Sequence, residues 1–129
     1  MSTSAPPNLE PATYVAAVIV LYVELPETPL CASVQDQRLA RRLHDRNVPL
    51  RLVETALLLA SLRRLIRPAE ALPLPPIRSL AYFQPVIDEL LDHPAPDHYL
   101  EYLRFKMRRI ADESSASANV QKNTFSGDR

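Results

Sequence analysis

The sequence predicts an all-α fold: a compact bundle of about five helices with disordered N- and C-terminal tails. Gly127 is the only glycine among the 129 residues, so the tight primed turns of short β-hairpins have no glycine on which to form. Thirteen prolines instead separate segments in which apolar residues recur every three or four positions, the period of an α-helix. The length suits one domain with a single core.

Two tails flank a helical domain that is expected over residues 11–111. Residues 1–10 are polar and contain serines and prolines, and residues 112–129 show no apolar period. Segments of this kind bury too little apolar surface to offset the entropy of ordering them. We therefore expect both tails to be disordered.

The first helix is expected over residues 12–24, before the sequence LPETPL. Its apolar residues follow the i, i+3, i+4 spacing of one helix face. They are Val15, Val18, Ile19, Tyr22 and Val23. Several of them are β-branched, so a buried strand is the alternative. The apolar run over 14–23 is too short to cross a bilayer.

The second helix is expected over residues 34–46. Ser33 is a natural N-cap, and Asp36 stands where a capping box needs its second member. Leu39 and Leu43, with Val34 or Ala40, form the apolar stripe. The other side of the helix carries Arg38, Arg41, Arg42 and Arg46.

The third helix is expected over residues 50–66. Asn47 stands where a left-handed residue ends the preceding helix, and Pro49 then opens the new one. More than half of the circumference is apolar, through Leu50, Leu52, Val53, Ala56, Leu57, Leu59 and Ala60. A helix that is apolar nearly all round is buried by several neighbours. This segment is therefore predicted to be the central helix, with arginines only at its two ends.

A proline-rich connector, residues 68–77, precedes a fourth helix over 79–91. Pro85 lies inside that segment and predicts a kink or a later start. The fifth helix is expected over 97–111, with Pro96 at its start. The expected core positions of these two helices are Leu80, Phe83, Val86, Ile87, Leu90, Leu91, Leu100, Leu103, Met107 and Ile110.

The charges balance, with 15 basic and 15 acidic residues, but they are unevenly spread. Residues 38–67 hold eight arginines against Asp45 and Glu54, and residues 104–109 hold four basic residues and no acid. A neutral total can therefore conceal a basic surface that favours polyanions. The alternative is that these arginines are solvated or pair with local acids.

The basic segments give a candidate nucleic-acid-binding site. Guanidinium groups bind phosphate in a bidentate geometry, and aromatic rings beside cations can stack on single-stranded bases. The candidate residues are Arg38, Arg41, Arg42, Arg46 and Arg51 near the corner of the second and third helices, and Tyr102, Arg104, Lys106, Arg108 and Arg109 in the fifth. The corner resembles a helix-turn-helix only poorly, because the turn lacks glycine and the third helix is too apolar for a DNA groove. In the fifth helix the alternative is aromatic packing at the core edge beside solvated bases.

The sequence carries no constellation typical of a catalytic or metal site. His44, His93 and His98 have no Ser, Cys or Asp arrangement that would activate a nucleophile. The prolines of DHPAPDH, residues 92–98, spoil the i, i+4 spacing of a metal-ligand pair. Cys31, the single cysteine, is expected to be a small buried hydrophobe in a reducing cytosol. We therefore expect no enzyme activity, no cofactor and no metal.

Residues 28–91 resemble the C-terminal domains of DnaD-type primosomal proteins and related modules of phage and plasmid replication proteins. ETPLCASVQDQRLARRLHDRNVPLRLVETAL matches the family's polar helix, short turn and buried helix, and IRSLAYFQPVIDELL resembles its tyrosine-bearing segment. Ser79, Tyr82, Val86 and Leu90 stand at the positions of that segment, which Pro85 interrupts. The resemblance implies a small helical domain that helps to bind DNA and a helicase. The layout is also similar to uncharacterised small proteins of bacterial mobile elements.

Together these observations predict a non-enzymatic, cytoplasmic, DNA-associated accessory protein of the replication or mobile-element kind. The expected partner is single- or double-stranded DNA, followed by a replication protein or a second copy of the chain, and no membrane. The alternative is a protein–protein interaction module or homodimer with no nucleic-acid role. It rests on the apolar first helix, which a five-helix domain need not cover fully.

Overall fold

The computed structural model describes residues 9–68 and 70–127, with side chains up to residue 113. Most of the predicted N-terminal tail therefore lies outside the described residues, as do residues 128–129. Within the described part the regular structure is wholly helical, which confirms the predicted all-α bundle. The elements are α1 (Pro11–Val23), α2 (Val34–Asp45), α3 (Leu50–Leu65), a 3-10 helix η1 (Leu80–Phe83), α4 (Gln84–Asp92) and α5 (Tyr99–Gly127). The first helix is thus a helix and not the alternative strand.

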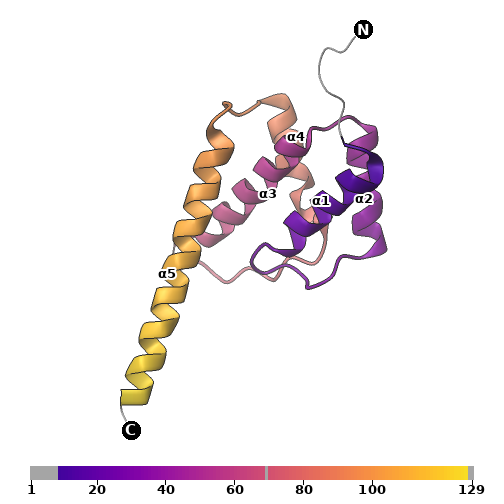
Figure 1. Cartoon of the computed structure of the whole chain (residues 1–129). Coiled ribbons are helices and arrows are strands. Elements are labelled where there is room, and N and C mark those ends of the chain that lie inside the picture. The colour runs from indigo at the N-terminus through magenta and orange to yellow at the C-terminus, as the bar shows by residue number, and fades with distance from the viewer. Residues whose placement is uncertain (1–8, 69, 128–129) are drawn as a thin grey trace.

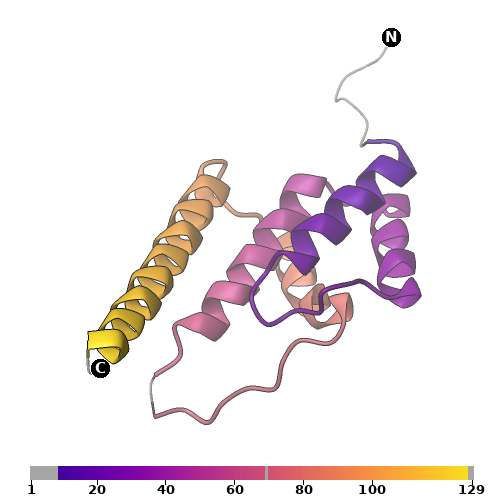
Figure 2. The same cartoon turned by 60° about the horizontal axis from the view of Figure 1, so that its bottom comes forward.

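The central element of the bundle is α3 (Figure 1). The helices α1, α4 and α5 each pack against it, whereas α2 packs mainly against α1. Val53, Ala56 and Leu57 are almost completely buried, which confirms the predicted central position of this helix. The helices α2 and α5 lie at opposite edges of the molecule in both views (Figures 1 and 2).

The core joins one face of α1 to α3, η1 and α4. Tyr14, Val18 and Tyr22 are fully buried and follow one another at intervals of four residues. The ring of Tyr22 meets that of Phe83 edge to face, with centroids 6.0 Å apart. Val15, which the sequence placed on the core face, is only half-buried. The buried face of α1 is therefore centred on Tyr14 and Tyr22, whose large aromatic rings bury more surface than a valine side chain does.

Local sequence signals set the starts and ends of the helices as predicted. Ser33 Oγ accepts a hydrogen bond from the N–H of Asp36, and the Asp36 carboxylate accepts one from the N–H of Ser33, which completes the capping box. Asn47 has φ of 60°, the left-handed conformation that closes α2. Pro85 lies in the first turn of α4, so α4 starts late at Gln84, directly after η1.

The last helix, α5, continues beyond the predicted end at residue 111. Its helical backbone runs to Gly127, so the end expected from the loss of apolar period is too early. No proline or glycine interrupts the sequence between Pro96 and Gly127, and an exposed helix can propagate without an apolar face. Figure 1 shows the lower part of α5 extending past the rest of the molecule.

Arg64, in the last turn of α3, holds the proline-rich connector to the bundle. Its guanidinium donates to the backbone oxygen of Pro75 (2.8 Å) and to the carboxylate of Glu27. It also donates to the hydroxyl of Tyr82 (3.3 Å). The N–H of Ile77 donates to the backbone oxygen of Glu27 (2.9 Å). The connector and the loop after α1 are therefore joined at one end of the molecule.

Candidate nucleic-acid interface

The outer face of α2 carries a row of three arginines that have no partner among the described residues. Arg38, Arg42 and Arg46 are exposed and follow one another at intervals of four residues, which aligns them along one side of the helix. Arg41 lies beside this α2 arginine row but pairs with Asp45, with 3.2 Å between Nε and Oδ1. The row therefore presents three positive charges that no described carboxylate neutralises.

Buried groups on the opposite side fix the orientation of α2. Ala40 and Leu43 are fully buried in the core. Asp36 is also buried, and its Oδ1 accepts hydrogen bonds from the N–H of Leu80 (2.9 Å) and from the hydroxyl of Ser79 (3.4 Å). Because this side of α2 is tied to the core and to η1, the arginine row points to solvent.

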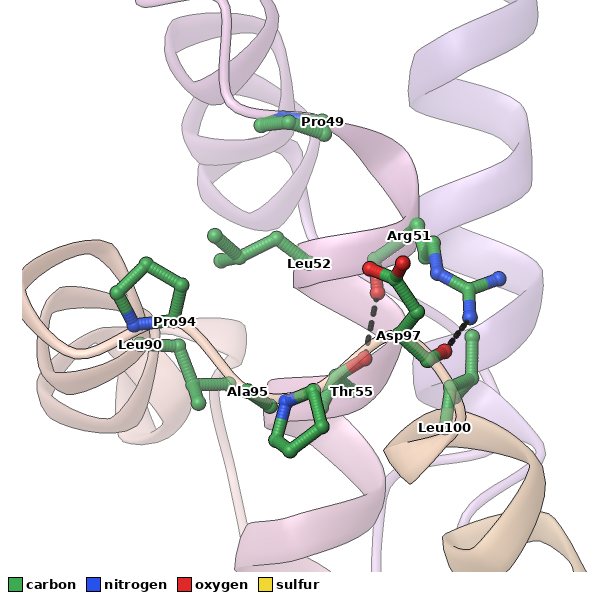
Figure 3. A pocket seen from close by; sticks show the side chains of 10 residues that line it. Pro49, Arg51, Leu52, Thr55, Leu90, Pro94, Ala95, Asp97 and Leu100 are labelled. Atoms are coloured by element: carbon green, nitrogen blue, oxygen red, sulfur yellow. Dashed lines mark hydrogen bonds between the residues drawn. The ribbon is translucent and has the colours of Figure 1, made fainter.

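Arg51, the fifth arginine of the predicted first group, does not join the row. It lies in the first turn of α3, and its guanidinium donates to the backbone oxygen of Asp97 (Figure 3). The hydroxyl of Thr55 donates to the backbone oxygen of Arg51 (2.8 Å). With Pro49 and Leu100, these residues line a cavity of about 190 Å³ between α3 and the loop before α5. Arg51 therefore holds that loop against α3.

Arg104, the centre of the predicted second group, joins α5 to α3. Its Nε and Nη2 donate to the two carboxylate oxygens of Glu54, at 3.0 and 2.8 Å, and its Nη1 donates to Glu101 at 3.1 Å. The hydrogen bonds that Arg104 donates to Glu54 raise the pKa of Arg104 further above its ordinary value. A guanidinium held by two carboxylates has little capacity left for a phosphate.

The rest of the second group divides into paired and unpaired side chains. Tyr102 is half-exposed and stacks against Tyr99, with ring centroids 6.0 Å apart. Arg109 pairs with a glutamate one turn further along α5, at 3.5 Å. Lys106 and Arg108 make no ion pair within the described part of the chain. The α5 group thus keeps two unpaired cations where the sequence predicted four.

The structure does not bring the two predicted groups together. Apart from Arg51 of α3, they belong to α2 and its C-cap and to α5, and these two helices lie at opposite edges with α1 and α3 between them (Figures 1 and 2). No sequence pattern foretold this, because the pairing of Arg104 joins residues that are 50 positions apart. The candidate interface is therefore the α2 arginine row, because Lys106 and Arg108 are two positions apart on α5 and project from different sides of the helix.

The outer face of α1 is a second surface, which the predicted site residues did not include. Ala12 and Ala16 are exposed there, and half of the surface of Val20 is exposed. Open apolar grooves run on both sides of this face, one against α2 and one against α3 and α5. The signal in the sequence is that residues 11–23 contain no charged side chain. A surface helix normally carries a polar face, so this one is exceptional.

Cys31 is exposed, and the prediction that it is buried is wrong. It lies in the loop between α1 and α2, where chain segments run over the surface. His93 and His98 are exposed in the loop between α4 and α5. No group of three or more His, Cys, Asp or Glu side chains is placed to hold a metal ion within the described residues. No helix in that part of the chain combines the length and apolarity needed to cross a bilayer.

Comparisons with protein-family models, curated proteins and solved structures find no match to this chain. The resemblance of residues 28–91 to DnaD-type domains therefore stays a prediction.

Proposed function

We propose that this protein is a non-enzymatic, nucleic-acid-associated accessory protein that binds the phosphate backbone through α2. The observation that carries the proposal is the α2 arginine row: Arg38, Arg42 and Arg46 are exposed, aligned and without a carboxylate partner among the described residues. Arginines in such a row are about 6 Å apart along the helix axis. They are suited to successive phosphates, which carry most of the nonspecific affinity for nucleic acid.

The surroundings of the row support a polyanion as the ligand. The neighbouring helix α1 contributes no charge, and the one acid on the outer side of α2, Asp45, is paired with Arg41. No carboxylate on either helix therefore opposes the row. The aligned guanidinium groups are suited first to phosphates, and the polar side chains exposed beside them on α2 are Gln35 and Gln37. The expected binding is nonspecific in sequence.

The test is a fluorescence anisotropy titration of the full chain with labelled single-stranded and double-stranded oligonucleotides at several salt concentrations. We expect a Kd between about 10⁻⁴ and 10⁻⁶ M at physiological salt, the range of nonspecific binding. The variant Arg38→Gln/Arg42→Gln/Arg46→Gln should weaken binding at least about tenfold. It should also lower the salt slope for duplex DNA by roughly three, since each phosphate contact contributes about 0.9.

The matched control removes the same charge at the opposite edge, through Lys106→Gln/Arg108→Gln/Arg109→Gln. We expect this control to change the Kd less than about threefold. Equal losses in the two triple variants would assign the binding to net charge and overturn the α2 interface. Absence of binding by the unaltered chain would overturn the nucleic-acid function altogether.

A second candidate function, self-association through α1, is favoured by the uncharged exposed face of that helix. Two copies could meet there without bringing like charges together, since residues 11–23 carry none. Sedimentation equilibrium should then show a dimer, and Val20→Glu, which places a charge at the exposed centre of the face, should return it to a monomer. A monomer at every concentration would exclude this function and leave the nucleic-acid proposal untouched.

A further inference from the structure

The connector between α3 and η1 carries a second, independent recognition feature. Residues 72–78 read LPLPPIR, and Figure 2 shows the connector running along the outside of the bundle. No regular secondary structure is assigned over residues 72–79. Leu72 in this stretch is 82% exposed.

Steric rules favour a polyproline II conformation for this stretch. The rings of Pro73, Pro75 and Pro76 fix φ near the polyproline value. Each residue that precedes a proline is also pushed out of the helical region, and this applies to Leu72, Leu74 and Pro75. The residues from 72 to 76 are therefore biased toward extended backbone, and we take them to form a left-handed helix with three residues per turn.

The threefold period divides this helix into three edges, and one of them faces the bundle. Leu74 and Ile77 are three residues apart and share that edge. Ile77 is almost completely buried, at 3% exposure, and Leu74 is far less exposed than Leu72, at 38% against 82%. The hydrogen bonds from Arg64 to the backbone oxygen of Pro75 and from the N–H of Ile77 to the backbone oxygen of Glu27 anchor the segment to the bundle.

The other two edges are directed to solvent. They hold two Xaa-Pro pairs, Leu72–Pro73 and Pro75–Pro76, followed by Arg78. All of these residues are exposed, and Arg78 has no partner among the described residues. Domains that bind proline-rich peptides take such pairs between aromatic rings, and they gain specificity from a charge next to the pairs.

We propose that residues 72–78 are a docking segment for a protein domain whose groove is lined by aromatic rings and flanked by a carboxylate, as in domains of the SH3 type. The two Xaa-Pro pairs occupy the aromatic slots, and Arg78 pairs with the carboxylate. Residues 71–77 carry no charged side chain, and the cations beside the segment are Arg78 at its end and Arg67, which donates to the backbone oxygen of Leu72 (2.9 Å), so an acidic groove is the complementary partner. The proposal does not depend on nucleic-acid binding.

The experiment titrates the full chain into purified SH3 domains that have acidic residues beside the groove, with isothermal calorimetry as the readout. The unaltered chain should bind saturably to at least one of them. Pro73→Ala/Pro76→Ala and, separately, Arg78→Glu should each weaken binding at least about tenfold. Leu74→Ala is the matched control, because Leu74 lies on the edge that faces the bundle, and it should change the Kd less than about twofold.

Thermal melts of each variant check that the bundle is intact, since Pro73, Pro76 and Arg78 are exposed and Leu74 is partly covered at 38% exposure. The proposal is overturned if no domain binds saturably at concentrations up to about 1 mM. It is equally overturned if Leu74→Ala weakens binding as much as the proline variant does, because the bundle-facing edge would then be the one in contact. Unchanged binding by Arg78→Glu would refute the acidic groove.

Discussion

Tyr14 and Tyr22 occupy equivalent buried positions on α1, but their hydroxyl groups differ. The hydroxyl of Tyr14 donates to the backbone oxygen of Val48 (2.7 Å), which fastens α1 to the turn between α2 and α3. The hydroxyl of Tyr22 is buried and makes no hydrogen bond within the described part of the chain. A buried polar group without a partner costs stability, whereas a satisfied one contributes to it.

Removing each hydroxyl should therefore have opposite results. Tyr14→Phe should lower the free energy of unfolding by about 1–2 kcal/mol, because a buried hydrogen bond is lost. Tyr22→Phe should leave it unchanged or raise it slightly, because no bond is lost and an unpaired group is removed. Urea unfolding at pH 7 measures both, and similar destabilisation by the two variants would contradict the assignment.

The two tyrosines also predict how stability falls in alkali. Burial raises the pKa of each to about 12, and the charge of Asp36 adds to the effect at Tyr22. The folded-state pKa lies above the value of 10.0 for an ordinary tyrosine, so keeping each buried hydroxyl protonated costs the folded state no stability below pH 10. As the pH rises from 10 toward 12 the unfolded tyrosine ionises first, and the free energy of unfolding falls by about 3 kcal/mol per tyrosine. In urea titrations from pH 9 to 12, Tyr22→Phe should retain more stability than the unaltered chain.

At the scale of the elements, Asp36 connects α2 to η1. Ser33→Ala removes one cap hydrogen bond and should cost about 1 kcal/mol. Asp36→Ala should cost more, about 2–4 kcal/mol, because it also leaves the N–H of Leu80 without its acceptor inside the core. Thermal and urea unfolding of the two variants measures the difference. Equal losses would mean that the contact with η1 contributes nothing.

The sequence predicts the elements well wherever a signal is local. Three boundaries follow from signals that lie within four residues of them: the start of α2 from Ser33 with Asp36, the end of α2 from Asn47, and the start of α4 from Pro85. The end of α5 was missed because a helix that leaves the bundle keeps no apolar period. Cys31 was misplaced because burial of a loop residue depends on the tertiary arrangement.

The candidate site could be predicted only in part, for a related reason. The unpaired row on α2 follows from four-residue spacing, which a sequence displays. Arg104 is bound to Glu54 and Arg51 to the backbone oxygen of Asp97, so neither is free to bind a phosphate. Both contacts join segments that are distant in the sequence. Packing decides such contacts, and no local pattern encodes them.

At the scale of the whole molecule, the positive charge of the α2 row implies an equal negative excess elsewhere, since the formal total is zero. Ion pairs such as Glu89 with Arg63 (2.8 Å) are neutral and contribute nothing to that excess, and the hydrogen bond from Arg63 lowers the pKa of Glu89. A chain with this distribution turns its α2 edge toward a polyanion before contact. Association should therefore be oriented as well as salt-dependent.

The extended end of α5 should contribute little to the stability of the bundle. Figure 1 shows it beyond the other helices, where there is no neighbour against which to pack. A chain that ends after Glu113 should keep its melting temperature within about 2 °C, since this shift corresponds to less than about 0.5 kcal/mol. Differential scanning calorimetry tests this, and a fall of more than about 8 °C would show that residues 114–129 support the bundle.

The anchoring of the connector by Arg64 has a consequence for hydrogen exchange. Prolines have no amide hydrogen, so residues 72–78 expose the amides of only Leu72, Leu74, Ile77 and Arg78 to deuterium. Of these, the Ile77 amide alone is shielded within the described structure, because it is buried and bonded to Glu27. Arg64→Met should accelerate exchange at Ile77 without changing the slow amides of α3. Arg67→Met removes only a hydrogen bond to the backbone oxygen of Leu72 (2.9 Å), at the other end of the segment, and should leave Ile77 protected. A single amide thus reports whether a largely exposed segment is attached to the bundle or detached from it.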